Sequence, residues 1–492
     1  MAKKVKFKLD GREIEADEGR LVIDAAKDAG VNIPHYCYHP ALGNPGNCRM
    51  CVVEVAGAPK PQVSCRTPVR EGLDVKTESE PIKRARAAML ELHLVNHPLD
   101  CPVCDQAGEC GLQNYYMEIG QYQSQVRENK DHKGKRIEVG PHVMLDQERC
   151  ILCTRCTRFV DNVTKTHELG IFRRGHSERV ELTPGLILDN AYSGNVVDVC
   201  PVGALTDRDF RYKVRVWYLD ETDSICTGCS RGCNISVHTN TKRPWHNDGK
   251  RVARLKPRHN HDVNGHWMCD DGRYGIGALD SGRLGRVLKL TPERRDASWE
   301  SAAEEIAKAL KAGGVAFVAS GMLSNEDWAA AKELFAGAKL YFCPEPDQIG
   351  VEDDFLRRRE KVPNLKGAEA LGLKSGSFDE LARDLESGKV KTLYVVERDL
   401  AKIWGAERAK ALIAKAAFRV YQGPNKNELS ESFDFRLPAT AYVEESGHFT
   451  NFEGKVQAYC KALEPIGQAR PDAEIFRLIA AAAPAARREV AA

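Results

Sequence analysis

The uneven distribution of cysteine is the feature that most constrains this chain. Of its 17 cysteines, 15 lie from Cys37 to Cys269, and only Cys343 and Cys460 lie beyond that stretch. The first residues, MAKKVKFKLD, lack the apolar core of a secretion signal, so we expect reduced thiols rather than disulfides. The clustered cysteines therefore predict metal sites. We expect Cys343 and Cys460, which lie in apolar or mixed segments, to be small core residues.

The first cysteine set consists of Cys37, Cys48, Cys51 and Cys65, with the spacing C-x10-C-x2-C-x13-C. The two irons of a 2Fe–2S cluster take four thiolates, and plant-type ferredoxins also use closely spaced cysteines with a distant one. The first gap here is longer than in the plant pattern. A single zinc ion also accepts four thiolates. The spacing favours a 2Fe–2S cluster and leaves zinc as the alternative.

The second set lies in the segment NHPLDCPVCDQAGEC and consists of His97, Cys101, Cys104 and Cys110. Zinc accepts three thiolates and one imidazole. A 4Fe–4S cluster with an imidazole ligand is unusual, because four cysteines are the general rule. His97 also fits an ordinary surface histidine, as does His93 one helical turn earlier. Spacing alone therefore leaves zinc and iron–sulfur equally open at this set.

The third set has the spacing that indicates a 4Fe–4S cluster most directly. Cys150, Cys153 and Cys156 form a CxxCxxC motif, and a proline follows the remote Cys200. Ferredoxins bind 4Fe–4S clusters with this arrangement. Three closely spaced thiolates hold three corners of the cube, and the distant cysteine holds the fourth. Zinc rarely uses such a triplet.

The fourth set consists of Cys226, Cys229, Cys233 and Cys269, and its spacing C-x2-C-x3-C-x35-C suits another 4Fe–4S cluster. Zinc is again the alternative. Four successive four-ligand sets favour an electron relay over four unrelated zinc sites. An interaction scaffold stabilised by zinc is the non-redox alternative.

Four segments of the chain resemble a known family. NCRMCVVEV, HPLDCPVCDQAGEC, CILCTRCTRFV and GNVVDVCPVGALT are similar to the large iron–sulfur subunit of respiratory complex I, NADH:quinone oxidoreductase, and the resemblance covers nearly the whole chain. It implies one 2Fe–2S cluster on the first set and three 4Fe–4S clusters on the others, with a histidine ligand in the second set. Only some bacterial members of the family have the fourth cluster. The implied ligands are Cys37, Cys48, Cys51, Cys65, His97, Cys101, Cys104, Cys110, Cys150, Cys153, Cys156, Cys200, Cys226, Cys229, Cys233 and Cys269.

The C-terminal half resembles molybdopterin oxidoreductases. The segments VPNLKGAEALG (362–372) and ESGHFTNFEGKVQ (445–457) carry the likeness, and many relatives continue beyond the point where this chain ends. No molybdenum-ligand motif is present, and Asp270 and Asp271 stand where those enzymes often place a lysine between cluster and pterin. We therefore expect a degenerate scaffold without molybdopterin. A molybdenum-dependent subunit of the formate dehydrogenase type is the alternative.

Hydrophobic periodicity and turn residues predict the secondary structure. Residues 5–15 alternate around an Asp-Gly pair and predict a hairpin, while 21–29 and 81–96 predict helices. Residues 121–137 are polar and predict a linker. After residue 295, strands and helices alternate, which predicts a parallel α/β sheet. The strands expected there are 315–319, 340–343 and 393–396, and the helices are one that follows Ser298, 325–336, 406–417 and a frayed helix or tail at 480–492.

The expected fold class combines two kinds of domain. Ferredoxin-like (β-grasp) and iron–sulfur α+β domains come first, and an α/β domain with a parallel sheet, resembling a truncated molybdopterin oxidoreductase, follows. The expected domains are a 2Fe–2S ferredoxin domain (1–78), a His/Cys 4Fe–4S domain (79–120), a 4Fe–4S ferredoxin-like domain with its linker (121–218), a 4Fe–4S domain of the molybdopterin-enzyme type (219–275) and the degenerate α/β domain (276–492).

Composition and motifs limit the possible functions. Lys and Arg number 72 against 70 Asp and Glu, which leaves a formal charge of +2 and no footprint for nucleic acid. No apolar run is long enough to span a membrane. No GxGxxG motif follows a predicted strand, so NADH and FMN are expected on a partner subunit.

The resemblance implies an oxidoreductase subunit that relays single electrons from flavin on a partner toward quinone. It implies no NADH site, quinone site or catalytic residue on this chain. The expected partners are the flavin/NADH-binding subunit and other peripheral-arm subunits. The expected location is the cytoplasmic face of the cell membrane, with membrane contact only through partners. A diaphorase subunit of an NAD-linked hydrogenase is a further alternative. Arg49, Arg155 and Arg158 are expected either to offset cluster charge or to be ordinary surface charges.

Overall fold

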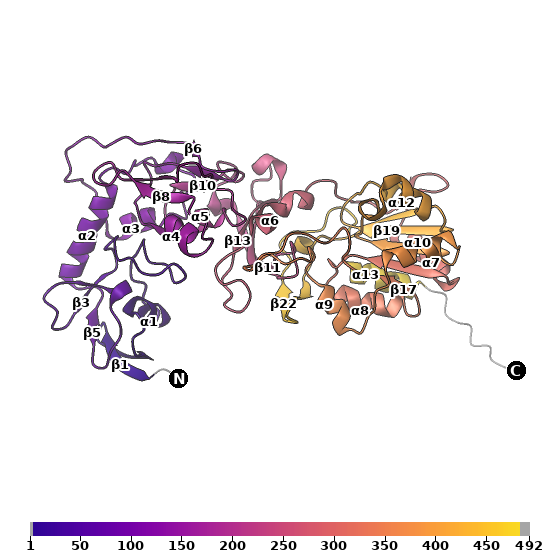
Figure 1. Cartoon of the computed structure of the whole chain (residues 1–492), viewed down its shortest axis with the longest axis horizontal. Coiled ribbons are helices and arrows are strands. Elements are labelled where there is room, and N and C mark those ends of the chain that lie inside the picture. Colours follow the sequence, from indigo (N-terminus) through magenta and orange to yellow (C-terminus); the bar gives the residue numbers. More distant parts are fainter. Residues whose placement is uncertain (1–2, 483–492) are drawn as a thin grey trace. The chain divides into compact units, whose positions relative to one another are not determined.

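The computed structural model describes residues 3–482. The chain divides into two compact units, one that ends at Tyr218 and one that begins at Leu219 (Figure 1). All of the first three cysteine sets lie in the N-terminal unit, and the fourth set lies in the C-terminal unit. We describe each unit by itself.

The N-terminal unit begins with a five-stranded sheet of the β-grasp type, in the strand order β2-β1-β5-β3-β4. The predicted hairpin is confirmed, because β1 and β2 pair antiparallel across a turn at Asp10 and Gly11, both of which have positive φ. The buried side chains of β1 face the buried side of helix α1. The elements are β1 (Lys4–Leu9), β2 (Arg12–Asp17), α1 (Val22–Asp28), β3 (Val52–Val55), β4 (Gln62–Val63) and β5 (Asp74–Lys76).

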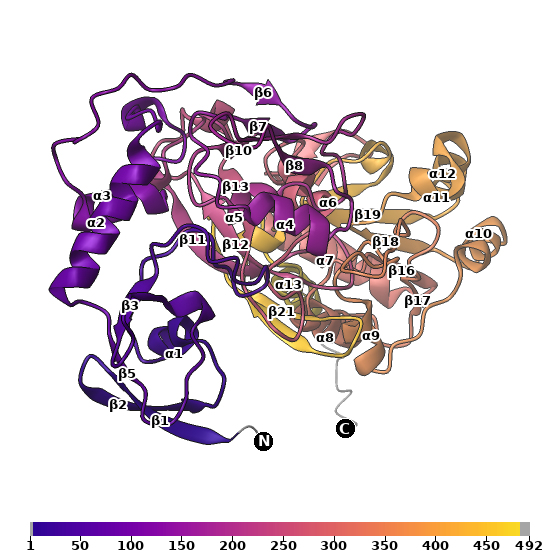
Figure 2. The same cartoon turned by 60° about the vertical axis from the view of Figure 1, so that its left-hand side comes forward.

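The rest of this unit contains little regular structure. The predicted second helix is confirmed as α2, which lies beside α3 (Figure 2). No helix or strand occupies residues 121–136, as expected of a linker. The elements are α2 (Glu80–Leu94), α3 (Gly111–Ile119), β6 (Ile137–Glu138), β7 (Val143–Leu145), α4 (Arg155–Asn162), β8 (Leu169–Phe172), β9 (Arg179–Leu182), α5 (Asn195–Val199) and β10 (Leu205–Asp207).

The C-terminal unit opens with a three-stranded antiparallel sheet that carries the fourth cysteine set. Its strands are β11 (Asp220–Ile225), β12 (Asn234–Thr239) and β13 (Val252–Pro257), and the short helix α6 (Asp270–Tyr274) follows. A hairpin of β21 (Gly447–Thr450) and β22 (Val456–Tyr459) also belongs to this unit.

A seven-stranded sheet forms the main part of the C-terminal unit, in the order β15-β14-β20-β19-β18-β16-β17. The five strands from β16 to β20 are parallel, which confirms the predicted parallel α/β sheet. Strands β14 and β15 add an antiparallel edge. The strands are β14 (Leu288–Lys289), β15 (Arg295–Asp296), β16 (Val315–Ala319), β17 (Lys339–Tyr341), β18 (Thr392–Val396), β19 (Phe418–Gly423) and β20 (Phe435–Pro438). The helices are α7 (Trp299–Lys311), α8 (Asn325–Leu334), α9 (Leu365–Ala370), α10 (Phe378–Glu386), α11 (Leu400–Trp404), α12 (Ala406–Ile413) and α13 (Asp472–Ala481).

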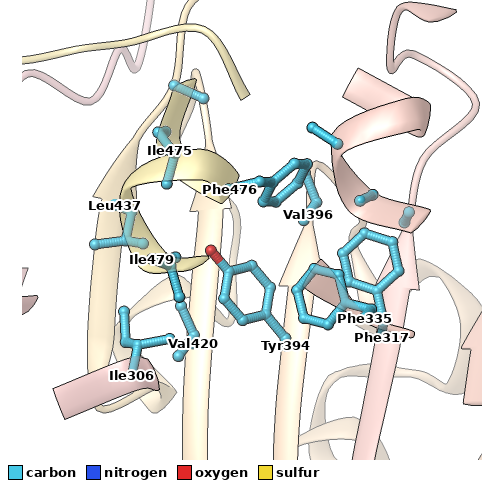
Figure 3. Packing of buried hydrophobic residues seen from close by; sticks show 14 of the residues in the cluster. Ile306, Phe317, Phe335, Tyr394, Val396, Val420, Leu437, Ile475, Phe476 and Ile479 are labelled. Atoms are coloured by element: carbon cyan, nitrogen blue, oxygen red, sulfur yellow. The ribbon is translucent and has the colours of Figure 1, made fainter. Parts of the chain in front are cut away.

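Both faces of this sheet are buried. Tyr394 and Val396 of β18 pack on one face against α7, α8 and α13, and Leu393 and Val395 pack on the other against α10, α11 and α12. In Figure 3, Phe476 of α13 points toward the aromatic side chains of that first face. A strand covered on both faces has no polar side, which explains the continuous apolar run that the sequence shows here.

Several boundaries differ from the sequence-based prediction. The predicted strand 340–343 is β17 at Lys339–Tyr341, and the predicted helix 406–417 ends at Ile413 because β19 begins at Phe418. Strands β19 and β20 and helix α10 were not predicted. Helix α13 ends at Ala481, and most of the segment predicted as a frayed helix or tail lies outside the described residues. No helix within residues 3–482 is long and apolar enough to cross a membrane.

The prediction that Cys343 and Cys460 are core residues is wrong for Cys460 and only partly right for Cys343. Cys460 is exposed and Cys343 is half-buried. Each follows closely after the end of a strand, β22 and β17 respectively, where the chain turns toward the surface. The apolar residues that precede each cysteine in the sequence belong to the strand, and the cysteine itself lies beyond the end of that strand.

Replacement of Phe476 by Ala should destabilise the C-terminal unit by about 3–5 kcal/mol, because Phe476 is fully buried against Phe317, Phe335 and Tyr394. The loss of stability is measured by thermal unfolding and by hydrogen exchange of the backbone amides of the sheet. Val456→Ala, at an exposed position of β22, is the matched control and should change little. An unchanged exchange rate in Phe476→Ala would contradict this account of the core.

Candidate metal centres

The first cysteine set is held by the loops of the β-grasp sheet. Cys37, Cys48 and Cys51 lie between α1 and β3, Cys65 lies in the 3-10 helix Ser64–Arg66, and all four are buried. The Cys37 thiol hydrogen-bonds to that of Cys48, and this bond, with backbone amide donors, lowers the pKa of Cys37 to about 5. Cys51 and Cys65 are hydrogen-bonded in the same way. The thiols therefore lie as two pairs, which fits the two irons of a 2Fe–2S cluster.

The second set encloses a cavity. His97 follows α2, Cys101 begins the 3-10 helix Cys101–Val103, Cys104 follows that helix, and Cys110 is the residue before α3. All four side chains line one cavity of about 250 Å³, whose other walls are mostly apolar. A single water molecule needs only about 10–15 Å³ of such space. The cavity therefore takes a group of several atoms, as a 4Fe–4S cluster is, rather than one zinc ion.

His97 has the chemistry of a ligand. Its Nδ1 atom is buried and has no hydrogen-bond partner among the described residues. Burial lowers the pKa of His97 to about 4, so the imidazole is neutral at physiological pH and has a lone pair for a metal. Gly203 also lines the cavity. A larger residue does not fit at this position, because an added Cβ atom would lie 2.5 Å from Cys104 Sγ.

The third set surrounds the start of α4. Cys150 and Cys153 lie in the preceding loop, Cys156 lies in the first turn of the helix, and Cys200 follows α5. Two of the four residues between the triplet cysteines, Leu152 and Thr154, have positive φ. Residues other than glycine rarely adopt that backbone conformation, and such strain is characteristic of functional sites. Here the two strained residues stand on either side of Cys153 in the chain.

Burial raises the pKa of the thiols in the third set. The pKa of Cys150 rises to about 12 and that of Cys153 to about 11, and the negative charge of neighbouring thiolates adds to the effect of burial. Cys150, Cys153 and Cys200 all help to raise the pKa of Cys156, so the four side chains lie close together. A metal centre that binds here displaces their protons, so binding depends on pH.

The fourth set joins two distant parts of the C-terminal unit. Cys226, Cys229 and Cys233 lie between β11 and β12, and Cys269 precedes α6. A Cβ atom added to Gly272 would lie 2.7 Å from Cys226 Sγ and 3.6 Å from Cys269 Sγ. All four cysteines are buried, and burial raises the pKa of Cys269 to about 11. The structure thus brings together the residues that the sequence predicted.

No group of three or more His, Cys, Asp or Glu side chains within residues 3–482 converges on a single metal ion. A 4Fe–4S cluster does not require such convergence, because its ligands bind different iron atoms.

Two arginines connect the first set to the third. The Arg158 guanidinium donates to the backbone oxygens of Cys37 and Leu42 and, at 3.5 Å, to that of Cys153. Arg155 donates to the backbone oxygens of Tyr38 and Val199. Both arginines therefore hold ligand-bearing loops together. Their positive charges also act to lower the pKa of Cys153. Arg49 is exposed, as an ordinary surface charge would be.

A backbone hydrogen bond connects the second set to the third. The Gly111 amide donates to the Pro201 carbonyl at 3.0 Å, and these residues directly follow the ligands Cys110 and Cys200. The Tyr36 ring, which precedes Cys37, would lie 3.9 Å from a Cβ atom at Gly111. The three sets of the N-terminal unit therefore meet around one small region of the chain.

A second cavity lies in the C-terminal unit at the carboxyl ends of the parallel strands. It has a volume of about 260 Å³. It lies where the order of the parallel strands reverses, because the chain continues from β16 to β17 on one side and then to β18 on the other. Ligands of open α/β sheets usually bind at such a point. Sequence analysis missed its four carboxyl groups because they come from separate elements. They are Asp327, Glu397, Glu445 and Asp472.

The charge of this cavity does not suit molybdopterin. Burial raises the pKa of Glu397 and of Glu445 to about 8, and the charge of Asp327 adds to both shifts. No lysine or arginine lines the cavity within the described residues. A pterin cofactor with its phosphate groups would meet carboxyl groups where it needs cations. Asp271, one of the two acidic residues that follow Cys269, lies 3.6 Å from Arg357.

The chain matches five protein families along its length. Residues 2–80 match a 2Fe-2S iron-sulfur cluster binding domain, and 86–125 match the NADH-ubiquinone oxidoreductase-G iron-sulfur binding region. Residues 140–206 match the ferredoxin-like domain of NADH-quinone oxidoreductase subunit 3. Residues 219–281 match the molybdopterin oxidoreductase Fe4S4 domain, and 357–482 match molybdopterin oxidoreductase. These matches and the four ligand sets define an iron–sulfur subunit of an oxidoreductase.

Similar proteins give the particular family. The G subunit of NADH-quinone oxidoreductase from Rickettsia conorii is 30% identical over 97% of this chain and 87% of its own length. The mitochondrial 78 kDa subunit of NADH-ubiquinone oxidoreductase from Candida albicans is 30% identical over 96% of this chain and 82% of its own. The chain belongs to the G-subunit family of NADH-quinone oxidoreductase. A crystal structure of NAD+-reducing [NiFe]-hydrogenase is 34% identical over 43% of this chain and 91% of its own, with a TM-score of 0.40.

Replacement of His97 by Cys should keep a 4Fe–4S signal and lower its reduction potential, because a thiolate adds one negative charge to the site. Redox titration followed by EPR measures the shift. Replacement by Ala should abolish or alter the same signal. An Ala variant with an unchanged signal would show that His97 is not a ligand.

Replacement of Gly272 by Ala should reduce iron bound at the fourth set several-fold, because the new Cβ atom would lie 2.7 Å from Cys226 Sγ. Gly275→Ala is the matched control, since a Cβ atom there meets nothing within 4 Å. Iron and sulfide per chain, with EPR of the reduced protein, measure the loss. Equal iron in both variants would mean that the fourth set does not hold a cluster in this geometry.

Proposed function

We propose that this chain relays single electrons from flavin on a partner subunit toward quinone, within an NADH:quinone oxidoreductase. Iron–sulfur clusters supply one-electron redox centres when they are bound. The proposed content is one 2Fe–2S cluster on the first set and three 4Fe–4S clusters on the others, with His97 among the ligands. The proposed domains are 1–78, 79–120, 121–218, 219–275 and 276–492.

The observation that carries the proposal is the direct connection between ligand sets. Arg158 contacts backbone oxygens beside a ligand of the first set and a ligand of the third, and Gly111 joins the second set to the third. A relay requires its centres to be close and held at fixed separations. The chain's own residues provide this by hydrogen bonds between ligand loops and by burial of the thiols, which excludes water.

The partners follow from what this chain does not offer. It has no GxGxxG motif after a strand, so we assign NADH and FMN to a partner subunit. The remaining partners are other peripheral-arm subunits of the complex. We place the chain at the cytoplasmic face of the cell membrane, with membrane contact only through those partners.

We propose that the C-terminal α/β region binds no molybdopterin. Four carboxyl groups line its cavity at the carboxyl ends of the strands, and no lysine or arginine among the described residues is present there to bind anionic phosphates. This argues against a subunit of the formate dehydrogenase type. Metal analysis of the purified protein tests it, since stoichiometric molybdenum would contradict the proposal. Iron and acid-labile sulfide, as opposed to zinc, test the cluster assignments in the same sample.

We propose that the fourth cluster mainly stabilises the C-terminal unit. Its ligands join the loop after β11 to the segment before α6, so the free energy of metal binding adds to that of folding. The molybdenum site that such a cluster would serve is replaced by the carboxyl-lined cavity.

Replacement of Cys229 by Ser should therefore reduce assembly or thermal stability, while the NADH-to-quinone rate per assembled flavin changes by less than about twofold. Replacement of Cys153 by Ser should abolish that rate, because the third set is connected to both other sets of its unit. The rate is normalised to flavin in the isolated complex. A fully assembled Cys229 variant whose normalised rate collapses would refute the stabilising role.

A further inference from the structure

A basic cavity lies at the antiparallel edge of the seven-stranded sheet, and none of the cysteine ligands lines it. Its volume is about 510 Å³, and its walls come from β14, β15, β20 and the loop after β19. Asp296 is the one acidic side chain among the described residues that line it. The basic residues that line it are Arg283, Arg286, Arg294, Arg295, Lys426 and Arg436.

Two of these arginines are buried and fixed in place. The Arg283 side chain is 4% exposed, and both its Nη atoms pair with Glu444, which is fully buried. Arg436 is buried and pairs with Glu431, but its Nε atom is buried without a hydrogen-bond partner among the described residues. Because these guanidinium groups are already ordered, an anion that binds beside them requires little further loss of side-chain freedom.

The other four cations give the cavity its excess charge. Arg286 and Arg294 each have one acidic partner, at 3.6 Å and 3.5 Å. Arg295 and Lys426 are exposed and make no ion pair with any described residue. Three carboxylates, from Glu431, Glu444 and Asp296, face the six cations, so the surplus is three positive charges. Such a concentration of like charge is unfavourable unless a counter-anion is present.

We propose that this cavity binds a small anion with two phosphate groups, such as inorganic pyrophosphate or the diphosphate of a nucleotide. Guanidinium groups bind phosphate oxygens through pairs of parallel hydrogen bonds, which a simple counter-ion does not use. The volume lies within the range of about 300–1,000 Å³ that is usual for small-molecule sites. The buried side chains of Leu284 and Leu288 form an apolar part of the wall. A concave site with buried arginines suits a compact anion better than an extended acidic peptide.

Calorimetric titration of the intact, cluster-loaded protein with pyrophosphate at low ionic strength tests the proposal. We expect saturable binding at one site and a pyrophosphate-dependent rise in the midpoint of thermal unfolding. The double variant Arg295→Gln with Lys426→Gln should weaken binding by at least about tenfold, because it removes the two cations without acidic partners. Both side chains are exposed, so this variant should keep its iron content.

The matched control is Arg408→Gln with Lys402→Gln, which removes the same charges from exposed positions on α12 and α11 outside the cavity. It should bind pyrophosphate like the unmodified protein. Equal weakening in both double variants would mean unspecific electrostatic attraction and would overturn the proposal, as would a lack of saturable binding. Vesicles of phosphatidylglycerol form the other arm. Binding to these vesicles without binding of pyrophosphate would identify a lipid surface as the source of phosphate and would also overturn it.

Discussion

Burial of the cysteine thiols governs how the ligand-bearing segments fold. In the third set burial raises the pKa of Cys150 and Cys153, and in the fourth set that of Cys269, so a metal centre that binds there must displace the protons of these thiols. The chain from residue 96 to residue 153 contains only one α-helix, a 3-10 helix and two short strands. Backbone hydrogen bonds alone give such segments little stability. We therefore expect metal binding at these sets to add to the folding free energy of the N-terminal unit.

The C-terminal unit shows how one sheet can carry two cavities with different linings, one of acidic groups and one of basic groups. At the carboxyl ends of the parallel strands, four carboxyl groups lie together, and their raised pKa values keep part of them protonated near neutral pH. At the antiparallel edge, arginines gather around a larger cavity. The parallel sheet matches that of molybdopterin oxidoreductases, but among the described residues carboxyl groups and no basic side chains line its usual ligand position. Fold and binding chemistry have separated in this unit.

The sequence indicates the candidate ligand sets because each closely spaced cysteine pattern is local. The triplet from Cys150 to Cys156 lies on one loop and one helical turn, so spacing alone indicates its geometry. The parallel sheet follows from short apolar runs that alternate with helices. The carboxyl-lined cavity does not follow, because Asp327 and Glu445 stand in separate elements that only the fold brings together. Cys460 was misjudged because apolar neighbours in sequence do not specify where a strand ends.

The contacts of Arg158 have an electrostatic consequence. Its guanidinium gives its hydrogen bonds to carbonyl oxygens, which carry no net charge, and no carboxylate forms an ion pair with it among the described residues. Its full positive charge therefore remains unneutralised in a half-buried region where the local dielectric constant is low. A lysine at this position has one compact ammonium group and could not span the same carbonyls. Arg158 thus acts as a counter-ion that is part of the chain itself. Its electric field reaches both the first and the third cysteine sets.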